Sequence, residues 1–153
     1  MAKASAGILL YRRTAERQLE VLLVHPGGPF WKNKDLGAWS VPKGEFLPGQ
    51  DRLEAAKREF KEELGRSING EFRELRPVRQ AGGKLVYCYA LEGDFDVSKL
   101  KSNTFSLEWP PRSGRQQEFP EVDRAEWFDI PTASTKINPS QAAFLNELSQ
   151  EVG

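Results

Sequence analysis

The chain has one cysteine and no surplus of charge of either sign. Cys88 has no second cysteine to pair with, which excludes a disulfide within these 153 residues and favours a reducing compartment. Because Cys88 lies in the apolar run LVYCYA, a buried structural thiol is favoured over a nucleophile. The 22 basic residues equal the 22 acidic ones in number, so charge gives no reason to expect long nucleic acid or an anionic membrane as a partner.

Long hydrophobic runs are also absent. No apolar stretch approaches the roughly 20 residues that a membrane-spanning helix requires, and the one near the N-terminus is too short for a signal peptide. We therefore expect a cytoplasmic protein. The length fits one domain, residues 1–153, with a hydrophobic core of its own.

Histidine occurs only once. His25 follows the apolar residues of a predicted strand and precedes Pro26. A lone histidine at the end of a strand is more often a hydrogen-bonded structural residue than a catalyst, and we expect that role here.

Apolar and alternating segments predict a mixture of strands and helices. The expected strands cover residues 4–11, 19–25, 75–80, 85–91, 104–109 and 124–130. Residues 81–83 (AGG) give a hairpin signal, and residues 139–152 predict a closing helix with Ser140 as its cap. The order of these elements indicates an α/β protein without fixing its topology.

A further helix is predicted between Asp51 and Gly65. Asp51 can cap the first turn, because a short carboxylate accepts from free backbone N–H groups. Gly65 can end the helix in the left-handed conformation. The apolar side chains of Ala56, Phe60 and Leu64 fall on one stripe at helical spacing and should face a core.

Three carboxylates, Glu59, Glu62 and Glu63, occupy a neighbouring face of this helix. Like charges at this spacing repel each other. The plain interpretation is a solvated acidic face that Arg58 partly balances. The alternative is a site for a divalent cation, because carboxylate oxygens are the ligands that Mg²⁺ prefers, and the glycine-containing turn at Gly44 lets a backbone carbonyl approach the same ion.

These residues lie in a pattern that resembles the Nudix hydrolase box, G-x5-E-x7-R-E-U-x-E-E-x-G-U, where U is a bulky apolar residue. Seven of the nine fixed positions match: Gly44, Arg58, Glu59, Phe60, Glu62, Glu63 and Gly65. The sequence departs from the pattern at Gln50, where the family has its first glutamate, and at Arg66, the final apolar position.

The resemblance implies a Nudix-type α/β/α sandwich, with a mixed sheet between the box helix and a C-terminal helix. It also implies a cofactor, Mg²⁺ with Mn²⁺ as an alternative, held by the box glutamates and the Gly44 carbonyl. Glu59 and Glu62 become candidates for activating water, and Arg58 is expected to orient the glutamates. Such enzymes often bring a further acid from a later loop, for which Glu118 is the first candidate and Glu121 the second.

The substrate implied is a small nucleotide with a pyrophosphate bond: an NTP, a dinucleoside polyphosphate, ADP-ribose or a nucleotide sugar. Residues 26–39 form a loop rich in Gly, Pro and aromatic residues, in which Trp31 and Trp39 can stack on a base. Lys43, beside the metal-binding turn, and Lys84, near the predicted hairpin, can meet phosphates. The oligomeric state is left open by the sequence.

Gln50 leaves two functional alternatives. If the first box glutamate is a ligand or a base, a neutral amide should lower activity; if it braces the loop, glutamine can replace it at modest cost. A catalytically silent nucleotide-binding module is the alternative function, with Gln50 and Arg66 as its only support. The intact Glu59, Glu62 and Glu63 argue against it, because a silent module has no need to keep mutually repelling ligands.

Overall fold

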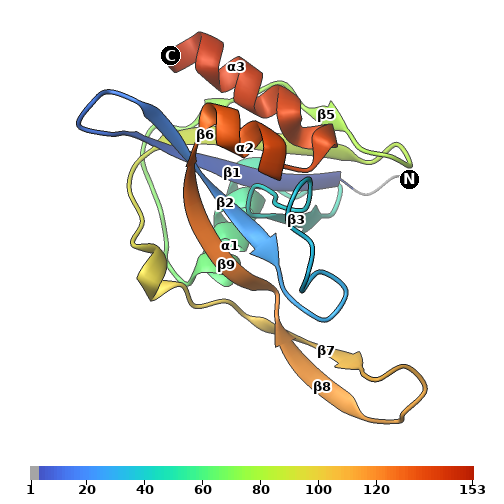
Figure 1. Cartoon of the computed structure of the whole chain (residues 1–153). Coiled ribbons are helices and arrows are strands. Elements are labelled where there is room, and N and C mark those ends of the chain that lie inside the picture. The colour runs from blue at the N-terminus through green and yellow to red at the C-terminus, as the bar shows by residue number, and fades with distance from the viewer. Residues whose placement is uncertain (1–3) are drawn as a thin grey trace.

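The structure is a computed structural model that describes residues 4–153 (Figure 1). Its strands are β1 (Ala4–Arg13), β2 (Leu19–Pro26), β3 (Lys43–Phe46), β4 (Arg73–Glu74), β5 (Val78–Arg79), β6 (Leu85–Glu92), β7 (Thr104–Glu108), β8 (Gln116–Pro120) and β9 (Val122–Asp129). Its helices are α1 (Arg52–Leu64), α2 (Ile130–Lys136) and α3 (Ala142–Val152), with short 3-10 turns η1 (Val97–Lys99) and η2 (Pro139–Gln141). None of the helices in residues 4–153 is long and apolar enough to cross a bilayer.

Within these residues the main sheet has seven strands and is mixed. Its main path runs β4-β6-β1-β2-β9, with β3 paired to β1 and β5 paired to β6. β1 is parallel to β6 and antiparallel to β2 and β3. β3 pairs with the first residues of β1, placing Lys43 opposite Gly7, and β2 pairs with the last, placing Val21 opposite Tyr11.

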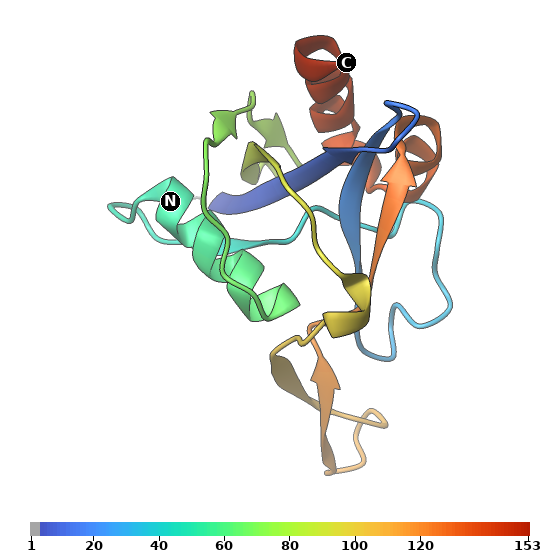
Figure 2. The ribbon, with the colours of Figure 1, turned by 90° about the vertical axis from the view of Figure 1, so that its left-hand side faces the viewer.

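Helices cover both faces of this sheet (Figure 2). Because side chains alternate along a strand, Ile8 packs in a cluster with Phe60 of α1, whereas Leu9 packs in a second cluster with Phe144 of α3. The two clusters lie on opposite faces of the sheet, each between the sheet and a helix, as in an α/β/α sandwich. This confirms the predicted fold class. Cys88 is fully buried in the second cluster, and burial raises the pKa of its thiol, in agreement with a structural role.

The helix predicted from the acidic stretch is confirmed as α1. The Asp51 side chain accepts a hydrogen bond of 3.0 Å from the Glu54 backbone N–H, and Gly65 ends the helix with a φ of 84°. Ala56, Phe60 and Leu64 are buried against the sheet, so the apolar stripe faces the core as its spacing predicts.

Three other elements differ from the sequence-based prediction. Of the strand expected over residues 75–80, only β5 (Val78–Arg79) forms, and β4 ends before that range at Glu74. Pro77 has no backbone N–H, and the Arg76 N–H donates to the Glu147 side chain. Helix α2 was not predicted, although Asp129 caps it and Pro131 lies in its first turn. The closing helix α3 begins at Ala142, and Gln141 before it makes no side-chain cap hydrogen bond; Ser140, the predicted cap, lies instead in η2, which Asn138 caps.

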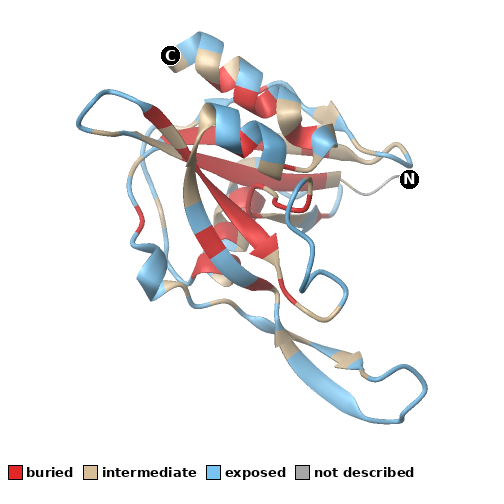
Figure 3. Cartoon of the chain, viewed as in Figure 1, coloured by how far each residue is buried: buried red, intermediate tan, exposed pale blue. Residues whose placement is uncertain are grey.

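The strands β7 and β8 form a separate two-stranded hairpin that extends away from the sandwich (Figure 1). Most of its residues are exposed or only half-buried (Figure 3). Residues 118–120, expected in an acidic loop, belong to strand β8. The main sheet resumes at once with β9, so Glu121 is the single residue between the hairpin and the sandwich.

Candidate active site

The C-terminal half of α1 carries three carboxylates against the core. Glu63 is only 7% exposed, and Glu59 and Glu62 are half-buried. Burial is the largest cause that raises the pKa of Glu63 to about 9, with the negative charges of Glu59 and Glu121 adding to it. Burial and the charge of Glu62 raise the pKa of Glu59 as well, while Arg58 opposes that shift. These acids therefore lie in a field that disfavours their charged forms until a cation arrives.

The fourth acid of the group is Glu121. Its backbone N–H donates to the Asn103 carbonyl over 2.8 Å, and its carbonyl accepts from the Gly27 N–H over 2.9 Å. Burial raises the pKa of Glu121, and the charge of Glu62 raises it further. Glu121 comes from a part of the chain remote from α1, so the fold brings a fourth carboxylate within electrostatic range of the three on α1.

Glu118, the first candidate for this position, lies elsewhere. It is exposed on β8, where it faces Ser106 across the hairpin. At about 3.3 Å per strand residue, it lies about 10 Å further along the hairpin than Glu121. The first and second candidates are therefore exchanged: Glu121 approaches the box acids and Glu118 does not.

Gly44 lies directly beside the box helix. A Cβ at this position would overlap the Glu59 carboxylate, so any side chain here would displace Glu59. The backbone of β3 and the Glu59 carboxylate are thus pressed together, as a shared ligand site between Gly44 and the box glutamates requires.

The four carboxylates are candidate ligands for a divalent cation. Among residues 4–153, no three Asp, Glu, His or Cys side chains stand close enough together to hold a metal ion in common. The four carboxylates are nevertheless hard oxygen donors. Each of them either raises the pKa of another member of the group through its negative charge or has its own pKa raised in this way. Their chemistry fits Mg²⁺ or Mn²⁺, because carboxylate oxygens are the ligands that these cations prefer.

Arg58 contacts the box directly. Its Nη2 lies 3.3 Å from Oε2 of Glu59, which is the contact expected of a residue that orients this glutamate.

The two residues that depart from the family pattern, Gln50 and Arg66, each make a hydrogen bond of their own. The Gln50 side chain accepts from the Leu47 N–H over 2.8 Å, and Arg66 donates to the Asp94 carbonyl over 2.9 Å. Gln50 therefore braces the loop before α1.

Lys43 is largely buried beside the acids. Burial and the nearby charge of Lys84 lower its pKa, whereas Glu63, Glu45 and Glu59 raise it. The Nζ atom of Lys84 lies 3.7 Å from Glu45. Because the charge of Lys84 affects the pKa of Lys43, the two ammonium groups repel each other, and an anion between them would reduce that repulsion.

A cavity of about 260 Å³ opens next to these charged groups. Its lining includes Glu63, Glu121 and Lys43, together with Trp31. Three amide side chains that sequence reasoning missed, Gln80, Asn138 and Gln141, also line it. Gln141 is buried and accepts from the Val41 N–H over 3.0 Å. The one feature of the sequence that points to these residues is the pair Asn138-Pro139, which is typical of a turn and precedes Gln141.

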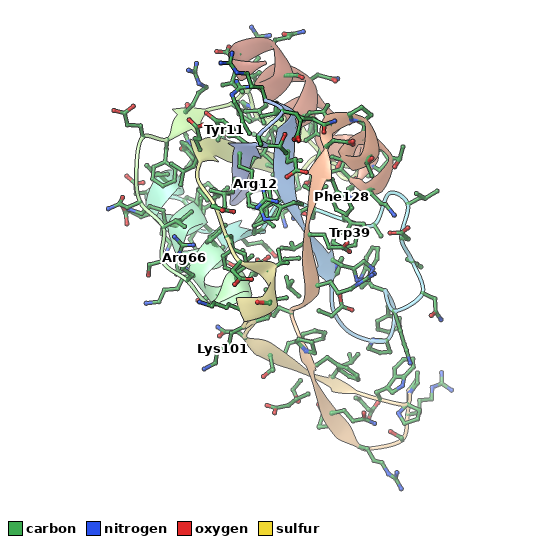
Figure 4. The ribbon with its side chains drawn as sticks, turned by 60° about the vertical axis from the view of Figure 1, so that its left-hand side comes forward. Tyr11, Arg12, Trp39, Arg66, Lys101 and Phe128 are labelled. Atoms are coloured by element: carbon green, nitrogen blue, oxygen red, sulfur yellow. The ribbon has the colours of Figure 1, made fainter. Side chains whose placement is uncertain are left out.

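The structure corrects the expectation for Trp39. With 1% of its surface exposed, Trp39 offers no free ring face to a base. Its indole N–H donates to Asp35 over 2.8 Å, and its ring packs edge-on against Phe128 with centroids 5.1 Å apart (Figure 4). Trp31, in contrast, is partly exposed and remains available for stacking.

His25 is fully buried and holds the loop of residues 27–38 in place. Its Nδ1 lies 2.8 Å from Oδ1 of Asp123, and its Nε2 lies 2.6 Å from the carbonyl oxygen of Lys34. With both ring nitrogens engaged and no exposed surface, His25 has the structural role that was predicted for it.

Fold and site together define the class of protein: an α/β/α sandwich with an acidic helix, a glycine turn and a cavity of about 260 Å³ beside them. Comparison with known families agrees, since residues 1–148 match the NUDIX domain. The chain belongs to the NUDIX family, as its box indicates.

Individual relatives are more distant. A segment of 37 residues is 49% identical to the RNA pyrophosphohydrolase of Erythrobacter litoralis (strain HTCC2594), covering 24% of this chain and 23% of that protein. Thus the match spans about a quarter of that relative's length.

Two solved structures share the fold. One is a C. elegans Ap4A hydrolase in a binary complex, with a TM-score of 0.64, 20% identity, and 95% of this chain and 96% of that one covered. The other is the NUDIX domain of Shewanella oneidensis NrtR complexed with ADP ribose, with a TM-score of 0.62, 18% identity, and 99% and 88% covered. At these identities the similarity is one of fold.

Proposed function

We propose that this protein is a Mg²⁺-dependent hydrolase that cleaves the pyrophosphate bond of a nucleoside diphosphate derivative. One observation carries the proposal: Glu59, Glu62, Glu63 and Glu121 share one electrostatic field beside a cavity that also contains Lys43 and Trp31. The family's general use of divalent metal ions supports the cofactor, and Mn²⁺ is the alternative to Mg²⁺.

The four carboxylates and the Gly44 carbonyl would hold the cation, which supplies neutralisation of phosphate charge and a bound water of lowered pKa. Phosphoryl transfer needs positioning and charge neutralisation more than a covalent nucleophile, and no Ser, Cys or His is assigned that part. Lys43 places a positive charge beside the phosphates. Glu59 and Glu62 within the box and Glu121 outside it are the acids positioned to take a proton from water.

The remaining residues hold the substrate and the acids. Arg58 orients Glu59 through their 3.3 Å ion pair. Trp31 offers a ring face to the base, and Lys84 adds a second cation near Lys43. The related proteins are named as an Ap4A hydrolase, a NUDIX domain complexed with ADP ribose and an RNA pyrophosphohydrolase, so nucleotides with an internal pyrophosphate form the class to test.

The deciding experiment measures product release from a panel of such nucleotides, with Mg²⁺ and with a chelator. Wild type is compared with Glu62→Gln and with Glu54→Gln, a matched change at an exposed acid in the first turn of the same helix. Metal-dependent turnover that is lost in Glu62→Gln and kept in Glu54→Gln is expected. Equal turnover in all three proteins, or none on any substrate, would overturn the proposal.

A further inference from the structure

The β7–β8 hairpin has one aromatic face. Phe105 and Phe119 lie opposite each other in the strand register, with ring centroids 6.0 Å apart. Trp109 follows β7 on the same side as Phe105, because side chains alternate along a strand. Polar residues, among them Ser106 and Glu118, occupy the other face.

The loop of residues 27–31 lies along this aromatic face. The ring of Phe30 packs edge-on against Trp109, with centroids 5.4 Å apart. A Cβ at Gly28 would lie 3.0 Å from the Phe105 ring, and one at Gly27 would overlap the Pro120 carbonyl. Glycine at both positions therefore allows the loop to approach the hairpin. We call Phe30, Phe105, Trp109 and Phe119 the aromatic wall.

Two residues of the aromatic wall lie close in the chain to residues that line the cavity. Trp31, which lines the cavity, directly follows Phe30, and Glu121, which also lines it, comes two residues after Phe119. The hydrogen bond from Gly27 to the Glu121 carbonyl joins loop and hairpin at this border. Figures 1 and 4 show the loop reaching toward the base of the hairpin.

The wall is not closed off by the rest of the protein. Phe30 remains 60% exposed although it contacts Trp109. Arg115, whose carbonyl accepts from the Trp109 N–H over 2.9 Å, lies opposite Trp109 and adds a cation on the same face. An exposed ring pair beside a cation suits a nucleobase attached to phosphate.

We propose that Phe30 and Trp109 form a second ring-binding site, which holds a base at the far end of the substrate's phosphate chain. The substrate class is then a polyphosphate with a nucleoside at each end, one base on Trp31 and the other on the aromatic wall. This proposal rests on the proposed function for its substrate, but ring binding can be measured without hydrolysis.

The test compares two ligands of equal phosphate charge by calorimetry without Mg²⁺. One is diadenosine tetraphosphate; the other is adenosine tetraphosphate with a methyl ester on its terminal phosphate, which has no second ring. We expect wild type to bind the first about tenfold more tightly, as one added base stack predicts. Phe30→Ala should remove this preference and leave the affinity for the methyl ester unchanged.

Two variants serve as controls. Phe30→Trp should restore the preference, because it returns a ring. Leu36→Ala, a truncation of another exposed apolar side chain in the same loop, should not change it. Equal affinity of wild type for the two ligands, or an equal loss of both in Phe30→Ala, would overturn the proposal. A two-ring preference without turnover on any substrate would instead reject the hydrolase function and leave the ring site standing.

Discussion

Nε2 of His25 lies 2.6 Å from the backbone carbonyl of Lys34, nine residues further along the chain. The other ring nitrogen faces the Asp123 carboxylate at 2.8 Å. This buried ring joins β2, β9 and the loop that carries Trp31 and Phe30.

Replacing His25 should therefore loosen the loop and destabilise the fold. We expect His25→Ala to lower the free energy of unfolding by about 2–3 kcal/mol, because a buried side chain with two hydrogen bonds is lost. Urea unfolding measures that change, and limited proteolysis should show faster cleavage within residues 27–38. Unchanged stability and cleavage would contradict the tethering role.

Glu121 and Glu118 should respond differently to the same substitution. Glu121→Gln removes a charge from the acid group and should lower turnover by about 100-fold. Glu118→Gln changes an exposed residue of the hairpin and should leave turnover within about twofold of wild type. Steady-state rates of the two variants on one substrate measure the difference, and the reverse order would restore Glu118 as the fourth acid.

Gln50→Glu should have little effect. A glutamate can accept the same hydrogen bond from the Leu47 N–H, by which residue 50 braces the loop before α1. We expect turnover within about threefold of wild type, because substitutions at exposed positions usually have small effects. A rise from undetectable to substantial turnover in Gln50→Glu would show instead that this chain lacks a catalytic charge at position 50.

The pH dependence of stability should reflect Glu63. Its folded pKa is raised from 4.5 to about 9, so between those values the folded state binds more protons than the unfolded state. The free energy of unfolding of the metal-free protein should therefore fall as pH rises through this window. Urea unfolding with a chelator at several pH values measures the slope. Glu63→Gln should flatten it, and an unchanged slope would show that other groups cause it.

Local chemistry made part of this structure predictable. Asp51 and Gly65 mark the ends of α1 through contacts within one helical turn, and the stripe of Ala56, Phe60 and Leu64 fixes its buried face. The strands β1, β2 and β6 carry enough apolar residues to be recognised. In each case the deciding interactions lie within a few residues of each other.

Other features depend on which distant segments meet. Trp39 reads as a loop aromatic, yet Asp35, Phe128 and His25 enclose it once the sandwich forms. The choice between Glu118 and Glu121 depends on where β8 ends and β9 begins, a register that alternation in the sequence does not set. Gln141 reaches the cavity only because α3 packs across the sheet from α1.

Cation binding tests the central claim most directly. Mn²⁺ added to the wild-type protein is followed by electron paramagnetic resonance, beside Glu63→Gln, Glu121→Gln and the exposed control Glu54→Gln. We expect wild type and Glu54→Gln to bind equally, and Glu63→Gln and Glu121→Gln to bind at least about tenfold more weakly, because both supply oxygen ligands. Equal binding by all four proteins, or no binding by wild type, would contradict a metal centre built from α1 and Glu121.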